Sequence, residues 1–191
     1  MSGVSTNEAT EIVTDTLDSR SLDLLSTTIN GQELRLSLPS NRRVIVPVIE
    51  LLRGVAEAVG VLSEKEQMPM SIALEEALNN AVVHGNLEVS SELRDREDDS
   101  FENMIEIRLH RKPYRERRVD VTAKFSDSEV RVTICDEGPG FDVSAVPDPT
   151  TEENICLNHG RGLFLMRSFM DEVQHNATGN QVTLVKRKNL A

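Results

Sequence analysis

A pair of alternating apolar segments in the second half of the chain most limits what it can fold into. Apolar side chains recur at every second position in residues 119–125 and again in residues 130–134, with Asp127-Ser128 between the two runs. A two-residue period predicts strands with one buried face, and a short polar break between such runs predicts an antiparallel hairpin. The second run leads directly into Asp136, so we expect this carboxylate at the end of a strand.

Helical and further strand patterns flank this hairpin. Helices are predicted from near Pro47 to Gly60, from Ser63 or Met70 through His84 with Gly85-Asn86 as the terminator, and after Gly162. Strands are predicted at residues 33–38, 173–176 and 182–186. This order predicts an α+β fold, a two-layer sandwich in which helices cover one face of a mixed, mostly antiparallel sheet.

The length of 191 residues and the hydrophobic content of 38% suit a single domain with one core, which we place at residues 33–191. Residues 1–32 are rich in Ser, Thr and acids, which predicts a mobile or loosely docked tail. Residues 88–118 hold an acidic block followed by a basic block, and we expect a solvated, partly helical insertion there. Residues 143–159 show little pattern and are predicted to form a loop or lid.

The formal net charge of -11 disfavours attraction to nucleic acid or to anionic membranes, because both require a basic surface. A basic protein partner fits this charge better. No apolar run approaches the roughly 20 residues that span a bilayer, and the N-terminus lacks a signal-peptide pattern, so we expect a cytoplasmic protein. Cys135 and Cys156 show no metal-ligand spacing and favour a reducing compartment.

The helix that ends at His84 carries a carboxylate and a carboxamide four residues apart, Glu76 and Asn80. On a helix both side chains can point into one pocket at the rim of the core, and His84 borders the same pocket. Such a pair can orient a hydroxyl and coordinate a hard cation through oxygen. Periodicity equally permits Glu75 with Asn79, and either pair can also consist of ordinary flanking residues.

Two glycine motifs follow this helix in the sequence. Asp136 precedes Gly138 and Gly140, and a carboxylate held there can accept a hydrogen bond from an exocyclic amine, while the glycines permit close approach of a ring or phosphate. Aspartate also commonly begins turns, and a lone Gly-x-Gly is a weak signal. Gly160-Arg161-Gly162 opens a helix, whose free N–H groups suit phosphate oxygens; Arg161 adds positive charge or is simply solvated.

Together these motifs resemble those of the GHKL ATPase superfamily, which includes gyrase, histidine kinases and mismatch-repair MutL, and most closely its branch of anti-sigma-factor serine kinases. The segment Glu76–Gly85 resembles the N box, Asp136–Phe141 the G1 box, and Gly160–Leu163 the G2 box. The resemblance covers about Glu33 to Lys188. It implies a Bergerat-type ATP-binding fold that uses ATP and magnesium.

The resemblance also implies a role for each candidate residue. Glu76 becomes the general base and Asn80 the magnesium ligand, which favours this pair over Glu75 and Asn79. Asp136 is expected to recognise adenine, with support from Thr183. The remaining expected nucleotide-binding residues are His84, Gly138, Gly140, Gly160, Arg161 and Gly162.

The function implied by the resemblance is that of a protein-serine kinase that regulates transcription by partner switching. Such kinases bind a sigma factor and phosphorylate a serine of an anti-sigma-factor antagonist, and they are often homodimers. The sequence shows neither a histidine-phosphorylation helix nor a transducer domain, which disfavours a sensor kinase or a gyrase-like machine. The alternative is a binding module that uses ATP only as a switching ligand and sequesters a protein partner. An α+β domain that binds no nucleotide would require all three motifs to occur in the correct order by coincidence.

Overall fold

The computed structural model describes residues 26–30, 33–96, 98–143 and 161–189. Six strands form one sheet in the order β1-β2-β3-β4-β6-β5, and every described pairing is antiparallel. The strands are β1 (Ser26–Asn30), β2 (Glu33–Pro39), β3 (Arg118–Phe125), β4 (Glu129–Cys135), β5 (Glu172–His175) and β6 (Gln181–Arg187). The α-helices are α3 (Ile45–Ala58), α4 (Glu64–Asn79), α5 (Ser100–Leu109) and α6 (Arg161–Phe169).

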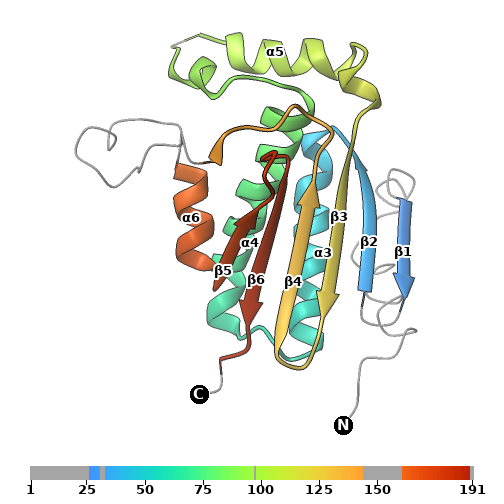
Figure 1. The fold of residues 1–191 in the computed structure, drawn as a ribbon, viewed down its shortest axis with the longest axis vertical. Coiled ribbons are helices and arrows are strands. Elements are labelled where there is room, and N and C mark those ends of the chain that lie inside the picture. Colours follow the sequence, from blue (N-terminus) through green and yellow to red (C-terminus); the bar gives the residue numbers. More distant parts are fainter. Residues whose placement is uncertain (1–25, 31–32, 97, 144–160, 190–191) are drawn as a thin grey trace, which may run out of the picture.

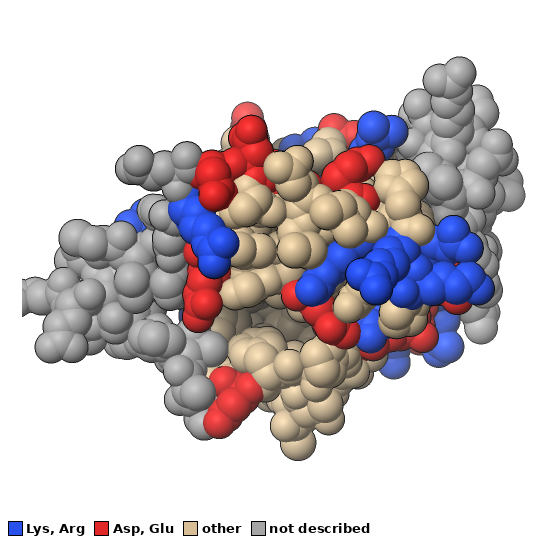
Figure 2. Space-filling model, turned by 90° about the horizontal axis from the view of Figure 1, so that it is seen from above, with Lys and Arg blue, Asp and Glu red and all other residues tan. Residues whose placement is uncertain are grey.

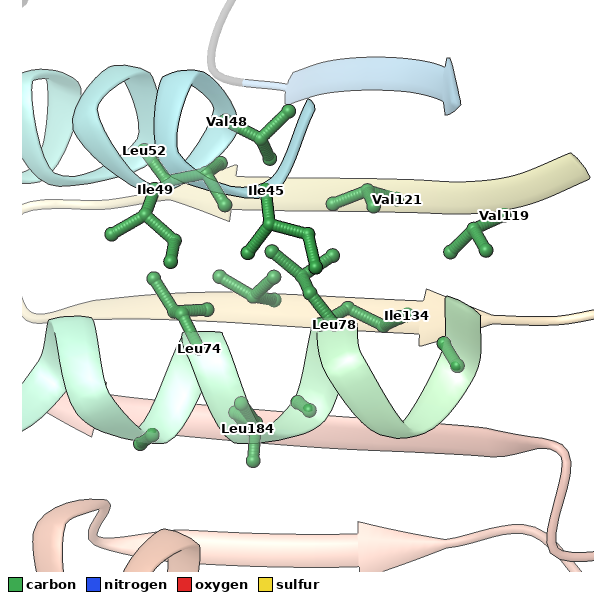
Figure 3. Close-up of a cluster of buried hydrophobic side chains, with 14 of the residues drawn as sticks. Ile45, Val48, Ile49, Leu52, Leu74, Leu78, Val119, Val121, Ile134 and Leu184 are labelled. Atoms are coloured by element: carbon green, nitrogen blue, oxygen red, sulfur yellow. The ribbon is translucent and has the colours of Figure 1, made fainter. Parts of the chain in front are cut away.

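Helices α3, α4 and α6 form a layer on one face of this sheet, which confirms the predicted α+β sandwich (Figure 1). Figure 3 shows Leu74 and Leu78 of α4 in one cluster with strand residues such as Ile134 and Leu184, and all four are at most 1% exposed. Each fully buried side chain of this size contributes about 1.5–3 kcal/mol through removal of apolar surface from water. The hydrophobic interior therefore lies between the helix layer and the sheet.

The predicted helices form close to their expected ends. Helix α3 begins at Ile45, so Pro47 lies in its first turn, where a missing N–H costs nothing, and the helix ends just before Gly60. Helix α4 begins after Ser63, whose N–H and hydroxyl both donate to the Oε2 atom of Glu66, at 3.1 and 2.6 Å. This capping box fixes the start at Ser63 and excludes the alternative at Met70.

Helix α4 continues directly into a π-helical segment, Asn80–Asn86. At its end the Leu87 N–H donates to the Val82 carbonyl oxygen at 3.0 Å, an i→i−5 bond. The predicted terminator at Gly85-Asn86 is confirmed, but the periodicity of the sequence gave no sign of the wider pitch. Such π segments are rare and are concentrated at functional sites in proteins.

The region predicted as a tail, residues 1–32, contains a strand near its C-terminal end. Ser26–Asn30 forms strand β1, which pairs with β2 so that Ser26 lies opposite Ser37. An edge strand has only one neighbour and needs no strong alternation, so its pattern is easily missed. Residues 1–25, and residues 144–160 with most of the predicted lid and Cys156, lie outside the described residues.

The insertion at residues 88–118 is partly helical, as predicted, but it also packs onto the domain. Phe101 and Ile105 of α5 are 8% and 4% exposed and belong to the main core. At its base, Arg117 forms an ion pair with Glu88 at 2.7 Å and stacks on the ring of Tyr114. The two ends of the insertion are therefore joined to each other.

Candidate functional site

A cavity of about 730 Å³ opens at the end of the sandwich that carries the insertion. It lies between α4 with its π segment, the start of the insertion, the loop after β4, helix α6 and the turn between β5 and β6. Figure 2, which looks onto this end, shows a hollow in the surface with charged side chains around it. Binding sites for small molecules have volumes of about 300–1,000 Å³, so a nucleotide fits.

The cavity resolves the two registers that periodicity left open on α4. Glu76 and Asn80 both line it, whereas Glu75 is exposed and neither Glu75 nor Asn79 is among the lining residues. The carboxylate and carboxamide of Glu76 and Asn80 therefore share one cavity. The pair stands where α4 passes into the π segment.

Helix α6 packs very closely against this pair. A Cβ atom added to Gly162 would lie 2.7 Å from Oε2 of Glu76 and 3.7 Å from Nδ2 of Asn80. A carbon at 2.7 Å from this oxygen would force the end of the Glu76 side chain to shift, so glycine is what lets α6 and the Glu76 carboxylate lie this close. Arg161 and Gly162, which begin α6, both line the cavity, whereas Gly160 lies outside the described residues.

Burial changes the acid–base properties of this end of the cavity. Desolvation raises the pKa of Glu76, and the positive charge of Arg94 offsets part of that rise. Desolvation also lowers the pKa of His84, which keeps its imidazole neutral. Nδ1 of His84 lies 2.6 Å from the Val89 carbonyl oxygen, and since a carbonyl only accepts, Nδ1 carries the proton. Nε2 of His84 is then left as a hydrogen-bond acceptor.

Asp136 lies at the other end of the cavity, directly after β4 as predicted. It is 8% exposed, and its Oδ1 atom accepts the N–H of Gly138 at 2.8 Å. Asn180 holds the backbone of Asp136 through two bonds, since its carbonyl accepts the Asp136 N–H at 3.0 Å and its Nδ2 donates to the Asp136 carbonyl at 3.1 Å. Burial raises the pKa of Asp136 to about 6, although the Gly138 N–H and the charge of Arg117 oppose this rise.

Glycines crowd the carboxylate of Asp136. A Cβ atom on Gly85 would lie 2.4 Å from Oδ1 of Asp136, so the end of the π segment and the strand end can meet only through glycine. Gly138 packs behind the carboxylate against Gly85 and does not line the cavity, whereas Gly140 does. The two predicted glycines thus have different positions relative to the cavity.

The expectation that Thr183 supports Asp136 is wrong in this structure. The Oγ1 atom of Thr183 lies 3.0 Å from Oγ1 of Thr133 on the sheet face away from the helices, and Thr183 does not line the cavity. Side chains alternate along β6, so its neighbours Val182 and Leu184 face the core and Thr183 cannot. Asn180, which makes two hydrogen bonds with the backbone of Asp136, supports this residue instead.

Asn86 holds the loop that carries the Asp136 motif, a role that the sequence did not indicate. Its side chain is fully buried; Oδ1 accepts the Glu137 N–H at 2.7 Å and Nδ2 donates to Oγ of Ser40 at 2.9 Å. The Ser40 hydroxyl in turn donates to the Arg117 carbonyl oxygen at 2.8 Å. One chain of hydrogen bonds therefore connects the π segment, the loop after β4 and the end of the insertion.

The insertion itself supplies part of the cavity wall, which the sequence analysis also did not predict. The lining residues from this segment are Glu88, Val89, Ser90, Ser91 and Arg94. Arg94 also stacks on Phe101, with its guanidinium carbon 4.7 Å from the ring centroid. A block of mixed charges looks the same in sequence whether it is solvated or folded over a site, so no pattern distinguished this segment.

Comparison with known proteins identifies one family. A family model described as the histidine kinase-like ATPase domain matches residues 38–186, a range that contains all of the candidate site residues. A search of curated proteins finds no match. In the part of the chain that the structure describes, no helix is long and apolar enough to cross a membrane.

Proposed function

The chain belongs to the histidine kinase-like ATPase family, and from this premise we propose that its cavity binds Mg-ATP and that the protein is a serine kinase of the anti-sigma-factor type. The observation that carries the proposal is the convergence of Glu76, Asn80 and Asp136 on one cavity. These residues come from two distant segments of the chain. Their side chains match the three chemical tasks of such a kinase, which are base catalysis, metal binding and adenine recognition.

Asp136 suits the adenine end of the site. One of its carboxylate oxygens is occupied by Gly138, and the carboxylate lines the cavity. A carboxylate in a nearly buried position accepts a hydrogen bond from an exocyclic amine strongly, because little water competes for it. The apolar side chains of Ile134 and Met166 line the same cavity and suit the faces of a purine ring.

The opposite end suits the phosphates. Arg161 and Gly162 at the start of α6 direct backbone N–H groups and positive charge toward this region. Asn80 offers an amide oxygen to this end of the cavity and would hold magnesium there, with water and phosphate oxygens as further ligands. Magnesium, when bound, neutralises the charge that develops on the phosphates.

Glu76 suits the role of general base. Burial raises its pKa, and a more basic carboxylate takes a proton from a serine hydroxyl more readily. In the proposed transfer Glu76 takes the hydroxyl proton and the serine oxygen bonds to the γ-phosphorus. The bond from that phosphorus to the β,γ-bridging oxygen breaks, and the products are phosphoserine and ADP.

The proposed partners are a sigma factor and the antagonist protein that carries the serine. The motif resemblance supports this assignment, and the net charge of -11 supports a protein partner over nucleic acid. The decisive experiment incubates the purified protein with γ-labelled ATP and proteins that co-purify with it, and then maps any label by mass spectrometry. Label on a serine of a partner is expected. Tight ATP binding without transfer would favour the binding-module alternative, and calorimetry without any heat of ATP binding would refute both.

A further inference from the structure

The insertion at residues 88–118 forms one wall of the nucleotide cavity, although none of the three motifs includes it. Its first turn, Ser91–Asp95, is a 3-10 helix that carries Arg94 to the cavity. A solvated excursion would not be expected to place a cation whose charge acts on the half-buried carboxylate of Glu76 and the half-buried imidazole of His84. The position of Arg94 therefore indicates a role in the cavity.

Arg94 is held in place by α5. Its guanidinium carbon lies 4.7 Å from the centroid of the Phe101 ring, and that ring is 8% exposed and belongs to the core. The Phe101 ring also lies 6.4 Å from the His84 ring, centroid to centroid. The guanidinium is therefore oriented by a rigid aromatic surface, which reduces the entropy lost when it binds a ligand.

Among the residues that the structure describes, Arg94 forms no ion pair, whereas Arg42 and Arg117 pair with Glu102 and Glu88. The acidic residues that line the cavity are Glu76, Glu88, Asp136 and Asp142, and the basic ones are Arg94 and Arg161. A polyphosphate that enters this cavity meets more carboxylates than cations, so each cation matters for its binding.

Arg94 lines the cavity and stacks on the Phe101 ring, which also neighbours His84, one helical turn after Asn80. Its charge acts on Glu76 and His84, while the charge that acts on Asp136 comes from Arg117. If adenine is bound at Asp136, the terminal phosphate extends toward Glu76 and Asn80. Among the described residues of the insertion, Arg94 is then the basic side chain that lines the cavity near that phosphate.

We propose that Arg94 binds the terminal phosphate of ATP, so that the insertion forms part of the nucleotide site and sets its preference for ATP over ADP. The proposal rests on the proposed binding of ATP and adds a residue from outside the motifs. A planar guanidinium can donate two parallel hydrogen bonds to phosphate oxygens, and ADP lacks the group that accepts them. Loss of Arg94 should therefore weaken the binding of ATP far more than that of ADP.

The test measures ATP and ADP affinities by calorimetry, with magnesium present, for the full-length chain and three variants. Arg94→Gln is expected to lower the ATP affinity about tenfold or more and to change the ADP affinity less than about threefold, because a charge-assisted hydrogen bond is lost for ATP alone. Arg94→Lys keeps the positive charge but loses the two parallel N–H donors and the stacking on Phe101. Its ATP affinity should lie between those of the wild type and Arg94→Gln. Arg96→Gln is the matched control, because Arg96 is exposed on the same insertion and does not line the cavity.

The outcomes separate this proposal from the proposed function. If the wild type binds neither nucleotide, ATP binding itself is refuted. If the wild type binds ATP and Arg94→Gln retains the ratio of the ATP and ADP affinities, the role of Arg94 is refuted while ATP binding stands. Equal losses for both nucleotides would also refute it, because they would indicate a structural effect, and the thermal unfolding of each variant checks that effect independently.

Discussion

The N–H of Glu137 donates a hydrogen bond to Oδ1 of Asn86 at 2.7 Å, although the two residues are 51 positions apart. This bond joins the end of the π segment to the loop that begins at Asp136. The catalytic helix and the adenine-binding loop of the proposed site therefore share a buried connection. One buried carboxamide that does not line the cavity therefore helps to hold them together.

Replacement of Asn86 by alanine is expected to destabilise the domain by about 1–3 kcal/mol, because the Glu137 N–H loses its acceptor and the buried Ser40 hydroxyl oxygen loses its donor. The ATP affinity should fall as well, since the loop is no longer fixed. Urea unfolding and calorimetry would measure the two effects. Asn79→Ala is the matched control on the same helix, where Asn79 is half-buried and outside the cavity, and it should change stability by less than about 0.5 kcal/mol. Equal effects of the two variants would contradict this role of Asn86.

Asp136→Asn is expected to stabilise the fold at neutral pH while it weakens nucleotide binding. The pKa of Asp136 rises from 3.8 to about 6 in the folded protein, so its contribution to stability is fully present below about pH 4 and is lost as the pH rises through about 6. Asparagine stays neutral, and above pH 6 the variant should be more stable by up to about 3 kcal/mol. Urea unfolding at about pH 4 and about pH 7.5 measures the difference. If the wild type were more stable than Asp136→Asn at about pH 7.5, burial of the Asp136 carboxylate could not be the cause of its raised pKa.

Glu76→Gln is expected to retain ATP binding and to reduce phosphoryl transfer by about 10²–10⁴-fold, because a positioned general base contributes a factor of this size. Labelled phosphate on the acceptor serine, measured in single-turnover experiments, gives the rate. Glu75→Gln is the matched control, since Glu75 is the exposed neighbour outside the cavity. Similar rates for Glu76→Gln and the wild type would exclude Glu76 as the base.

Asn80→Ala is expected to remove the contribution of magnesium to ATP binding. The wild type should bind ATP more tightly with magnesium than with a chelator, and the variant should show little difference between the two conditions. The affinity without magnesium should stay close to that of the wild type, because only a metal ligand is lost. A variant that retains the full magnesium effect would show that the metal is held without Asn80.

The hairpin, the helix that ends at Gly85-Asn86 and the candidate pair Glu76 and Asn80 could be predicted because each is a local pattern. A strand has a period of two and a helix a period of 3.6, and side chains a turn apart share a face whatever the rest of the chain does. The register of the pair was open from periodicity alone, and the packing of α4 on the sheet places Glu76 in the cavity. Local patterns therefore predicted most of the elements, and the choice between the two pairs on α4 required their packing.

The features that could not be predicted depend on contacts between distant segments. Asn86 gave the pattern of a helix terminator, because nothing in its neighbourhood shows that Glu137 and Ser40 will meet its side chain. Nothing in the sequence distinguishes Arg94 from the other charged residues of the insertion. Thr183 was assigned by motif resemblance, and one position along a strand decides which face a side chain occupies, so a small shift in the alignment changed its predicted environment completely.

The ion pair between Glu88 and Arg117, at 2.7 Å, closes the insertion at its base. Because the insertion leaves and re-enters the domain at neighbouring points, it connects the π segment to β3 as a short turn would. The entropy cost of closing such a loop grows only with the logarithm of its length. Segments of different length and sequence that still cover the core where Phe101 and Ile105 pack can therefore be exchanged between these two residues without a new fold for the sheet. Evolution can change one wall of the cavity in this way and leave the catalytic helix untouched.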